Sequence, residues 1–208
     1  METPHYKEVL VARPLCVSGA FHVETETGLN MLDAVRIVLL NPSHPGNIGA
    51  IARAMKNMGL RDLVLVAPDR FPDPQAEARA AAAADLLATA RVVADFDEAV
   101  GDCHLVVGTS SRSRTLPWPV LEPRHLAARL ANDYRGRRVA IVFGREERGL
   151  SNGELQRCNL HVQIPANPSY PVLNLAMAVQ IIGYELHLQW RDEHPEVREA
   201  LPDDRGPV

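Results

Sequence analysis

The stretch between residues 139 and 188 constrains the fold of this chain more than any other part of the sequence. A short apolar run at 139–143 has the character of a strand, and the polar loop after it opens on Gly144 and closes on Gly149. A second predicted strand, 160–164, ends in another irregular segment, and a helix that is apolar on almost every side follows at 173–190. Open α/β sheets bind ligands in loops at the carboxyl ends of their strands. We therefore expect both loops to take part in a ligand site.

The rest of the chain alternates apolar runs with stretches of helical period. This alternation favours an α/β fold with a largely parallel sheet flanked by helices. The near-continuous apolar run at 35–40 suits a parallel strand that is buried on both faces. Residues 1–30 lack a clear period, so we expect a flexible N-terminal extension before a single domain at 31–190. The polar residues at 191–208 predict a loose tail. Further strands are expected at 63–66, 91–94 and 104–108, and helices at 47–58, 75–90, 95–100 and 122–132.

Composition narrows the class of protein. The chain has 208 residues, of which 46% are apolar and 23% charged, as in an ordinary globular domain with a real core. Its net charge of -4 argues weakly against non-specific coating of nucleic acid. The three cysteines are far apart and form no C-x-x-C, which is typical of reduced thiols in a cytosolic protein. No apolar run reaches the roughly 18 residues of a membrane span, and we expect a cytoplasmic protein without a membrane partner.

Several familiar sites are absent from the sequence. The loop at 144–149 has the glycine spacing of a nucleotide P-loop, but Leu150 stands where its lysine should be. There is no dinucleotide-binding G-x-G-x-x-G and no G-x-S-x-G elbow for a serine nucleophile. The histidines have no metal-ligand spacing, so we expect no metal. What remains is a set of glycine-rich and small polar loops, which suit a small ligand held mainly by main-chain groups.

Arginines flank these loops and also lie on the helix expected at 47–58. Asn47 is a plausible N-cap of that helix, and Gly49, Arg53 and Lys56 gather on the face opposite its apolar residues. This polar face is either solvated or part of an anion site beside the preceding loop. The arginines near the loops are either exposed surface residues or a lining for phosphate or an RNA backbone. They are Arg53, Arg112, Arg114, Arg145 and Arg148.

Three ordered motifs sharpen this reading through a family resemblance. The runs N-I-G-A-I-A-R at 47–53, V-F-G-R-E-E-R-G-L at 142–150 and I-P-A-N-P…L-N-L-A-M-A-V at 164–179 resemble the motifs of the SPOUT class of methyltransferases. The runs at 41–60 and 106–119 narrow the resemblance to bacterial tRNA (cytidine/uridine-2′-O-)-methyltransferases. The match covers about 35–190. Several motifs in the right order are specific, whereas any one of them alone would be weak.

The resemblance implies a fold, a cofactor and an assembly. The implied fold is an α/β sheet whose C-terminal segment forms a deep trefoil knot. The implied cofactor is S-adenosyl-L-methionine, bound at the knot without a metal. The implied assembly is a homodimer, which agrees with a helix that must be covered on every side. The cofactor contacts at matching positions are Thr109, Ser110, Ser111, Gly144, Ile164, Pro171, Val172 and Leu173.

The implied reaction is methylation of a ribose 2′-oxygen of cytidine or uridine in tRNA, with position 32 of the anticodon loop as the expected target. Arg53 resembles the family's catalytic arginine. A guanidinium is a poor base, so stabilising the developing alkoxide or gripping a phosphate is the easier role for it. Structural roles are implied for Asn47, Gly49, Glu146, Gly149 and Asn174. The candidate RNA contacts are Lys56, Arg112, Arg114, Arg145 and Arg148.

Two departures from the family pattern leave alternatives open. Family members commonly carry a serine where this chain has Val172, so only a main-chain contact is expected there. Relatives also continue beyond residue 208 with a helical extension that helps to hold tRNA, so we expect cofactor binding without it but weaker tRNA affinity. The alternatives are a related 2′-O-methyltransferase for another tRNA position or for ribosomal RNA, and a catalytically weak RNA-binding relative. The protomer that supplies Arg53 to a given site is also open.

Overall fold

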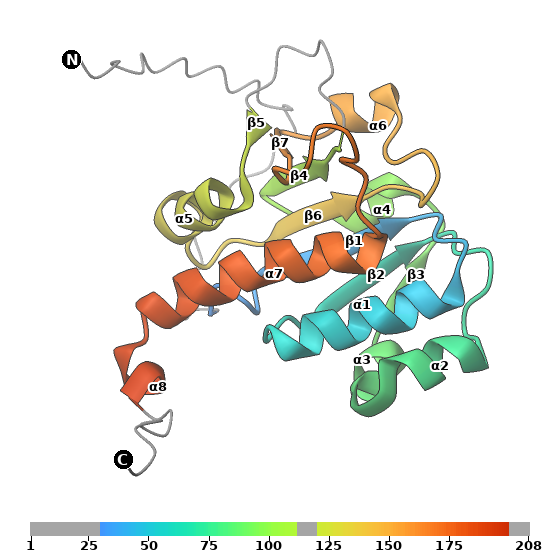
Figure 1. Cartoon of the computed structure of the whole chain (residues 1–208), viewed down its shortest axis with the longest axis horizontal. Coiled ribbons are helices and arrows are strands. Elements are labelled where there is room, and N and C mark those ends of the chain that lie inside the picture. Colours follow the sequence, from blue (N-terminus) through green and yellow to red (C-terminus); the bar gives the residue numbers. More distant parts are fainter. Residues whose placement is uncertain (1–29, 112–119, 200–208) are drawn as a thin grey trace, which may run out of the picture.

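The structure is a computed structural model that describes residues 30–111 and 120–199. Within these ranges the strands form one seven-stranded sheet in the order β3-β2-β1-β6-β4-β7-β5 (Figure 1). Every pair of neighbouring strands runs parallel, which confirms the predicted α/β fold. The strands are β1 (Val35–Leu40), β2 (Asp62–Val66), β3 (Arg91–Val93), β4 (Leu105–Thr109), β5 (Val120–Leu121), β6 (Val139–Phe143) and β7 (Leu160–Val162).

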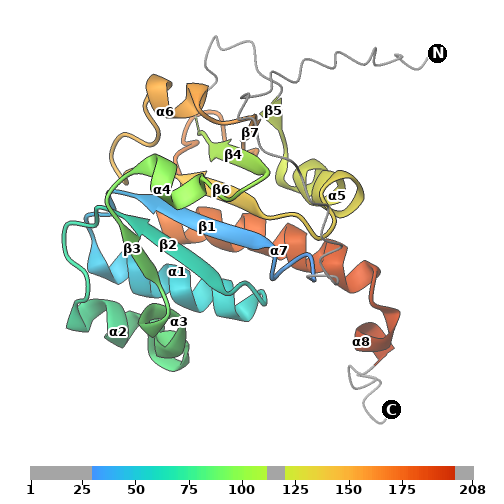
Figure 2. The same ribbon diagram turned by 180° about the vertical axis from the view of Figure 1, so that it is seen from behind.

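Helices cover both faces of the sheet. Figure 1 shows α1 and α7 side by side on one face, and Figure 2 shows α4 on the other. Side chains along β1 alternate between the two cores: Ile37 packs toward the α1 and α7 side, and Val38 packs into the second cluster. The helices are α1 (Pro45–Asn57), α2 (Pro74–Ala80), the 3-10 turn η1 (Ala81–Ala83), α3 (Ala84–Ala88), α4 (Phe96–Val100), α5 (Pro123–Asp133), α6 (Asn152–Gln156), α7 (Leu175–Asp192) and α8 (Pro195–Glu199).

Helix α1 begins two residues earlier than expected. Its N-cap is His44 rather than Asn47, and Pro45 occupies the first helical position. Proline suits this position because its fixed φ matches the helix and its missing N–H would have no partner there. Asn47 therefore lies in the first turn, where its side chain is directed by tertiary contacts rather than by a capping bond.

The alanine-rich segment is not one continuous helix. The helix expected at 75–90 is divided into α2, η1 and α3, and the break falls at Ala81, whose φ is +50°. Alanine favours a helix at every position, so its propensity does not indicate where the chain must turn. The turn places Ala83, Leu86 and Leu87 in the core on the α1 side. Burial of these side chains stabilises the broken helix over a continuous one.

The segment before α7 is longer than the periodicity indicated. Strand β7 ends at Val162 and α7 begins at Leu175, with Asn174 as N-cap accepting a hydrogen bond from the Ala176 N–H at 2.9 Å. After Trp190 the chain stays helical to Asp192 and forms α8, while residues 200–208 and 1–29 lie outside the described part. The knot implied by the family resemblance stays a prediction.

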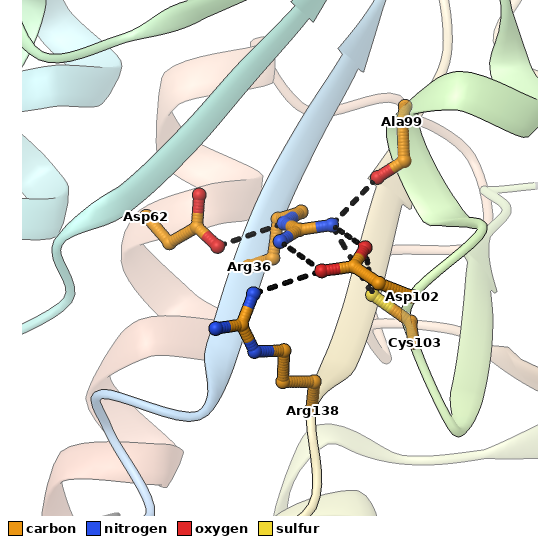
Figure 3. A network of polar contacts seen from close by, with 6 residues as sticks. All are labelled: Arg36, Asp62, Ala99, Asp102, Cys103 and Arg138. Carbon is orange, nitrogen blue, oxygen red and sulfur yellow. Dashed lines mark hydrogen bonds and ion pairs between the residues drawn. The ribbon is translucent and has the colours of Figure 1, made fainter.

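An ion-pair network around a buried arginine connects the amino ends of the strands. Arg36 of β1 is 3% exposed and donates hydrogen bonds to Asp62 at 2.7 Å, to Asp102 at 2.5 and 3.0 Å, and to the Ala99 carbonyl at 2.9 Å (Figure 3). Arg138 donates a second bond to Asp102 at 2.8 Å. These residues lie at the starts of β1, β2, β4 and β6, so the network is at the end of the sheet opposite the predicted ligand loops.

Candidate active site

A cavity of about 400 Å³ lies at the carboxyl ends of β4, β6 and β7. It is bounded by residues 109–111 at the end of β4, by 143–150 at the end of β6, by 171–175 at the start of α7, and by the start of α1. The loops that the sequence predicted as a ligand site therefore meet around one space. All the positions predicted to contact the cofactor line it: Thr109, Ser110, Ser111, Gly144, Ile164, Pro171, Val172 and Leu173.

The loop after β6 closes tightly on itself. The Gly149 N–H donates to the Arg145 carbonyl at 2.8 Å, and Gly149 has a φ of +66°. A Cβ at Gly144 would lie 2.0 Å from the Gly149 carbonyl carbon, a distance that no side chain can occupy. Glycine at both positions is thus a steric requirement of this turn. The closed turn brings its backbone to the edge of the cavity.

Glu146 ties this turn to the loop before α1. Its carboxylate accepts hydrogen bonds from the Ser43 N–H and hydroxyl at 3.2 and 3.1 Å, from the His44 N–H at 3.3 Å and from Asn47 Nδ2 at 3.2 Å. Burial by itself would raise the pKa of Glu146, but these donors outweigh it and hold the pKa below its usual value. The carboxylate is therefore an anionic clamp between two loops.

The clamp continues into the segment that precedes α7. Asn174 Nδ2 donates to Asn47 Oδ1 at 3.1 Å, while the Asn174 Oδ1 caps α7. Asn47 thus bridges Glu146 and Asn174, and these three of the five residues predicted to have structural roles join three separate segments. Each segment contributes residues to the cavity, so this chain of bonds sets the relative positions of its walls.

Arg145 is held within the protein rather than left free for RNA. Its guanidinium donates to Glu154 at 3.0 and 3.2 Å and to Asn41 Oδ1 at 2.5 Å. Burial alone would raise the pKa of Glu154, but bonds from the Ser151 N–H and from Arg145 lower it overall. Arg148, by contrast, is exposed at the rim of the cavity. Of these two candidate RNA contacts, the structure leaves Arg148 facing solvent.

Two predicted residues of α1 face a neighbouring helix instead of the cavity. A Cβ at Gly49 would lie 2.1 Å from the Ala76 carbonyl oxygen, so α2 packs directly on the face that the sequence suggested was solvated or anion-binding. Lys56 Nζ bonds Asp85 at 2.8 Å and the Ala82 carbonyl at 2.7 Å. The hydrogen bond from Lys56 lowers the pKa of Asp85. Both positions therefore connect α1 to α2 and to the segment that follows it.

Arg53 is also away from the cavity of its own chain. It is exposed and does not line the cavity, whereas Asn47 does. Six residues of helix separate the two, which corresponds to about 9 Å along the axis and about 120° around it. Arg112 and Arg114, the remaining candidate RNA contacts, lie outside the described residues.

Comparison with known proteins identifies the family. The profile of the SpoU rRNA Methylase family matches residues 34–184, which include β1, the closed turn after β6 and most of α7. The chain belongs to the SpoU methylase family. This confirms the resemblance inferred from the three motifs and their order.

Individual relatives of this SpoU methylase agree. A tRNA (cytidine/uridine-2′-O-)-methyltransferase TrmJ from Pectobacterium atrosepticum is 55% identical over 181 residues, which cover 84% of this chain and 75% of that protein. Among solved structures, a probable methylase family protein from Haemophilus influenzae Rd KW20 has a TM-score of 0.75 and 47% identity, over 85% of this chain and 73% of that one. The SpoU methyltransferase AviRb from Streptomyces viridochromogenes, in complex with the cofactor AdoMet, has a TM-score of 0.58 and 25% identity, over 74% and 59%.

The cavity of this SpoU methylase has further lining residues that were not among the predicted site residues. Leu175, Ala178 and Ile182 line it from α7 at the spacing of one helix face, a signal that the periodicity could have supplied once the start of α7 was known. His44 and Glu147 line it from the loops after β1 and β6. No sequence pattern of these two residues would have predicted that they line the cavity.

The described residues show neither a metal cluster nor a membrane span. Within 30–111 and 120–199, no cluster of three or more His, Cys, Asp or Glu side chains could hold a metal ion, and no helix is long and apolar enough to cross a membrane. The two cysteines of this part are free thiols. Burial raises the pKa of Cys103 to about 11 and that of Cys158 to about 12, so neither is a reactive thiolate at neutral pH.

Proposed function

We propose that this SpoU methylase transfers the methyl group of S-adenosyl-L-methionine to the ribose 2′-oxygen of cytidine or uridine in tRNA. One observation carries the proposal: all eight positions that match the family's cofactor contacts line a single cavity. The relative that is 55% identical bears the name of this activity, and AviRb binds the same cofactor on a similar fold. The expected target is position 32 of the anticodon loop, and the expected compartment is the cytoplasm, where tRNA is found.

The residues of the cavity fit this cofactor. A volume of about 400 Å³ is in the usual range of small-molecule sites. Apolar side chains such as Ile164 and Leu173 suit a purine base, while the hydroxyls of Thr109 and Ser110 and the nearby main chain suit polar groups. The anionic Glu146 favours a cationic sulfonium. When bound, the cofactor supplies an electrophilic methyl group, and the task of the protein is to orient the ribose and exclude water.

Arg53 acts across a dimer in this proposal. It lies away from the cavity of its own chain, so we assign it to the cavity of a second copy, where it would hold a phosphate oxygen or the developing alkoxide. The outer face of α7 supports a homodimer, because Met177 and Tyr184, seven residues apart on one face, are 61% and 49% exposed. Exposed apolar residues in such a row are typical of an interface between subunits.

A second candidate function is methylation of ribosomal RNA, because the matching family bears the name of an rRNA methylase. Tritiated methyl transfer to unmodified tRNA transcripts and to rRNA, with the modified nucleotide mapped, separates the two. We expect label on the ribose of tRNA nucleotide 32. Label on rRNA alone would favour the second candidate, and no label on either RNA would refute both.

Arg53→Ala tests the assigned arginine. We expect methyl transfer to fall by at least 100-fold while the Kd for S-adenosyl-L-methionine stays within twofold, because in this proposal Arg53 contacts the RNA and not the cofactor. Arg61→Ala is the matched control, since Arg61 is an exposed arginine near the end of α1 whose closest carboxylate, on Asp33, is 3.9 Å away. Retained transfer in Arg53→Ala would remove Arg53 from the mechanism.

A further inference from the structure

We propose that His44 is the catalytic base that takes the proton from the ribose 2′-hydroxyl, an assignment that rests on the proposed function. The reaction requires such a group, because a neutral hydroxyl is a weak nucleophile and its proton must leave as the new bond forms. The titratable groups that line the cavity are few: His44, Arg145, Glu146, Glu147 and Arg148.

Neither the arginines nor Glu146 is suited to this role. A guanidinium has no acceptor atom and keeps its proton at any physiological pH, which excludes Arg145 and Arg148. Glu146 already accepts four hydrogen bonds, and these lower its pKa, so its oxygens are occupied and weakly basic. Carboxylates as a class are weaker bases than imidazoles by about two pKa units. Glu147 therefore ranks below His44 as a proton acceptor.

The placement of His44 matches the role. Its N–H is anchored to Glu146 at 3.3 Å and Pro45 follows it, so its backbone is fixed on both sides. Its side chain makes no capping hydrogen bond to α1, although it stands at the N-cap, and the residue is exposed at the cavity. A histidine whose main chain is clamped and whose ring is not used for capping is positioned to receive a proton from a bound ligand.

Charged groups on several elements surround His44 and act in opposite directions. The N-terminus of α1 disfavours an imidazolium, and so do the nearby arginines of the cavity and Arg79, which packs across Gly46 from α2. Glu146 and Glu147 favour it, as does Asp69, whose N–H donates to the Pro42 carbonyl. The cavity segments 109–111 and 171–175 contribute no titratable side chain. Charges of both signs therefore surround the ring that receives the proton.

The 2′-O–H bond breaks and its proton passes to a ring nitrogen of His44, while the oxygen forms a bond to the methyl carbon. The bond between that carbon and the sulfonium sulfur breaks, so the sulfur keeps the electron pair and leaves as a neutral thioether. The imidazolium then releases its proton to solvent. In this scheme Arg53 binds a phosphate oxygen or the developing alkoxide of the RNA, and His44 accepts the proton.

The test compares His44→Gln with His104→Gln, which changes an exposed histidine at the opposite end of the sheet. Single-turnover methyl transfer to tRNA is measured from about pH 5.5 to 8.5, with the Kd for S-adenosyl-L-methionine and the Tm of each variant. General-base catalysis contributes about 10²–10⁴-fold. We expect the rate of His44→Gln to be lower than the wild-type rate by that factor. We also expect the wild-type rate to fall toward acidic pH, in the range where imidazoles titrate, and the rate of His44→Gln not to fall there. Its cofactor Kd and Tm should match those of His104→Gln.

Chemical rescue separates a catalytic from a structural role. We expect added imidazole to restore part of the rate of His44→Ala but none of the rate of Arg53→Ala. A His44→Gln variant with the wild-type rate and an unchanged acid limb would overturn the assignment, as would loss of that limb in Glu147→Gln alone. If wild-type protein transfers no methyl group to RNA, the proposed function fails instead, so the two failures are distinguishable.

Discussion

Replacing Asp102 by asparagine should destabilise the protein without touching the cofactor site. Asp102 accepts two hydrogen bonds from Arg36, a side chain that is 3% exposed (Figure 3). Hydrogen bonds to charged groups contribute about 1.5–3 kcal/mol each, and breaking a fully buried ion pair costs about 3–5 kcal/mol. Asp102 is 48% exposed and Asp62 still pairs with Arg36, so we expect the smaller loss of about 2 kcal/mol in the free energy of unfolding.

Urea denaturation measures this loss. We expect a lower midpoint at an unchanged m-value, and a Tm lower by about 4–8 °C. Asp97→Asn is the control, because it removes a carboxylate of 80% exposure from a surface pair with Arg157 and should cost less than about 1 kcal/mol. The Kd for S-adenosyl-L-methionine should not change in either variant. A loss below about 0.5 kcal/mol for Asp102→Asn, or additive effects with Arg36→Met, would refute the reasoning.

The same pair predicts a dependence on pH. The hydrogen bond from Arg36 holds the pKa of Asp102 well below its usual value in the folded protein. A group whose pKa is depressed by folding stabilises the protein above its unfolded pKa, about 3.9 for aspartate, and this contribution is lost as the pH falls further. Wild-type protein should therefore lose more stability than Asp102→Asn between about pH 4 and pH 2. Parallel curves for the two proteins would contradict this.

Two further predictions concern packing and RNA. Gly49→Ala should lower the free energy of unfolding by about 1–3 kcal/mol, because a Cβ there would lie 2.1 Å from the Ala76 carbonyl oxygen. The control in the same thermal denaturation series is Gly153→Ala, because a Cβ at Gly153 would have no atom within 4 Å. Equal Tm values for the two variants would refute this prediction. Arg148→Ala should weaken tRNA binding and reduce its salt dependence, whereas Arg145→Ala should mainly weaken cofactor binding because its guanidinium holds the cavity loop. Filter binding and cofactor titration test this pair, and the reverse pattern would reject it.

Local patterns in the sequence determined much of the fold. The apolar runs at 35–40 and 139–143 are strands with the predicted bounds. A strand that is buried on both faces is apolar at every position, so its bounds can be read from the run itself. The alternation of strands and helices was enough for a parallel α/β sheet. The order of three motifs was enough for the family and for the residues that line the cavity, since most of those lie in the motif loops.

Tertiary structure decided which polar side chains are available for chemistry. Arg145 and Arg148 look alike in the sequence. Only Arg145 donates a hydrogen bond to Asn41, which lies 104 residues earlier in the chain. Gly49 lies on a polar face by periodicity, yet α2 covers it. The physical reason is that periodicity reports only which side of a helix or strand is apolar. The partner of a polar group is chosen by how distant segments meet, and here Glu146 determines that meeting by joining loops about a hundred residues apart.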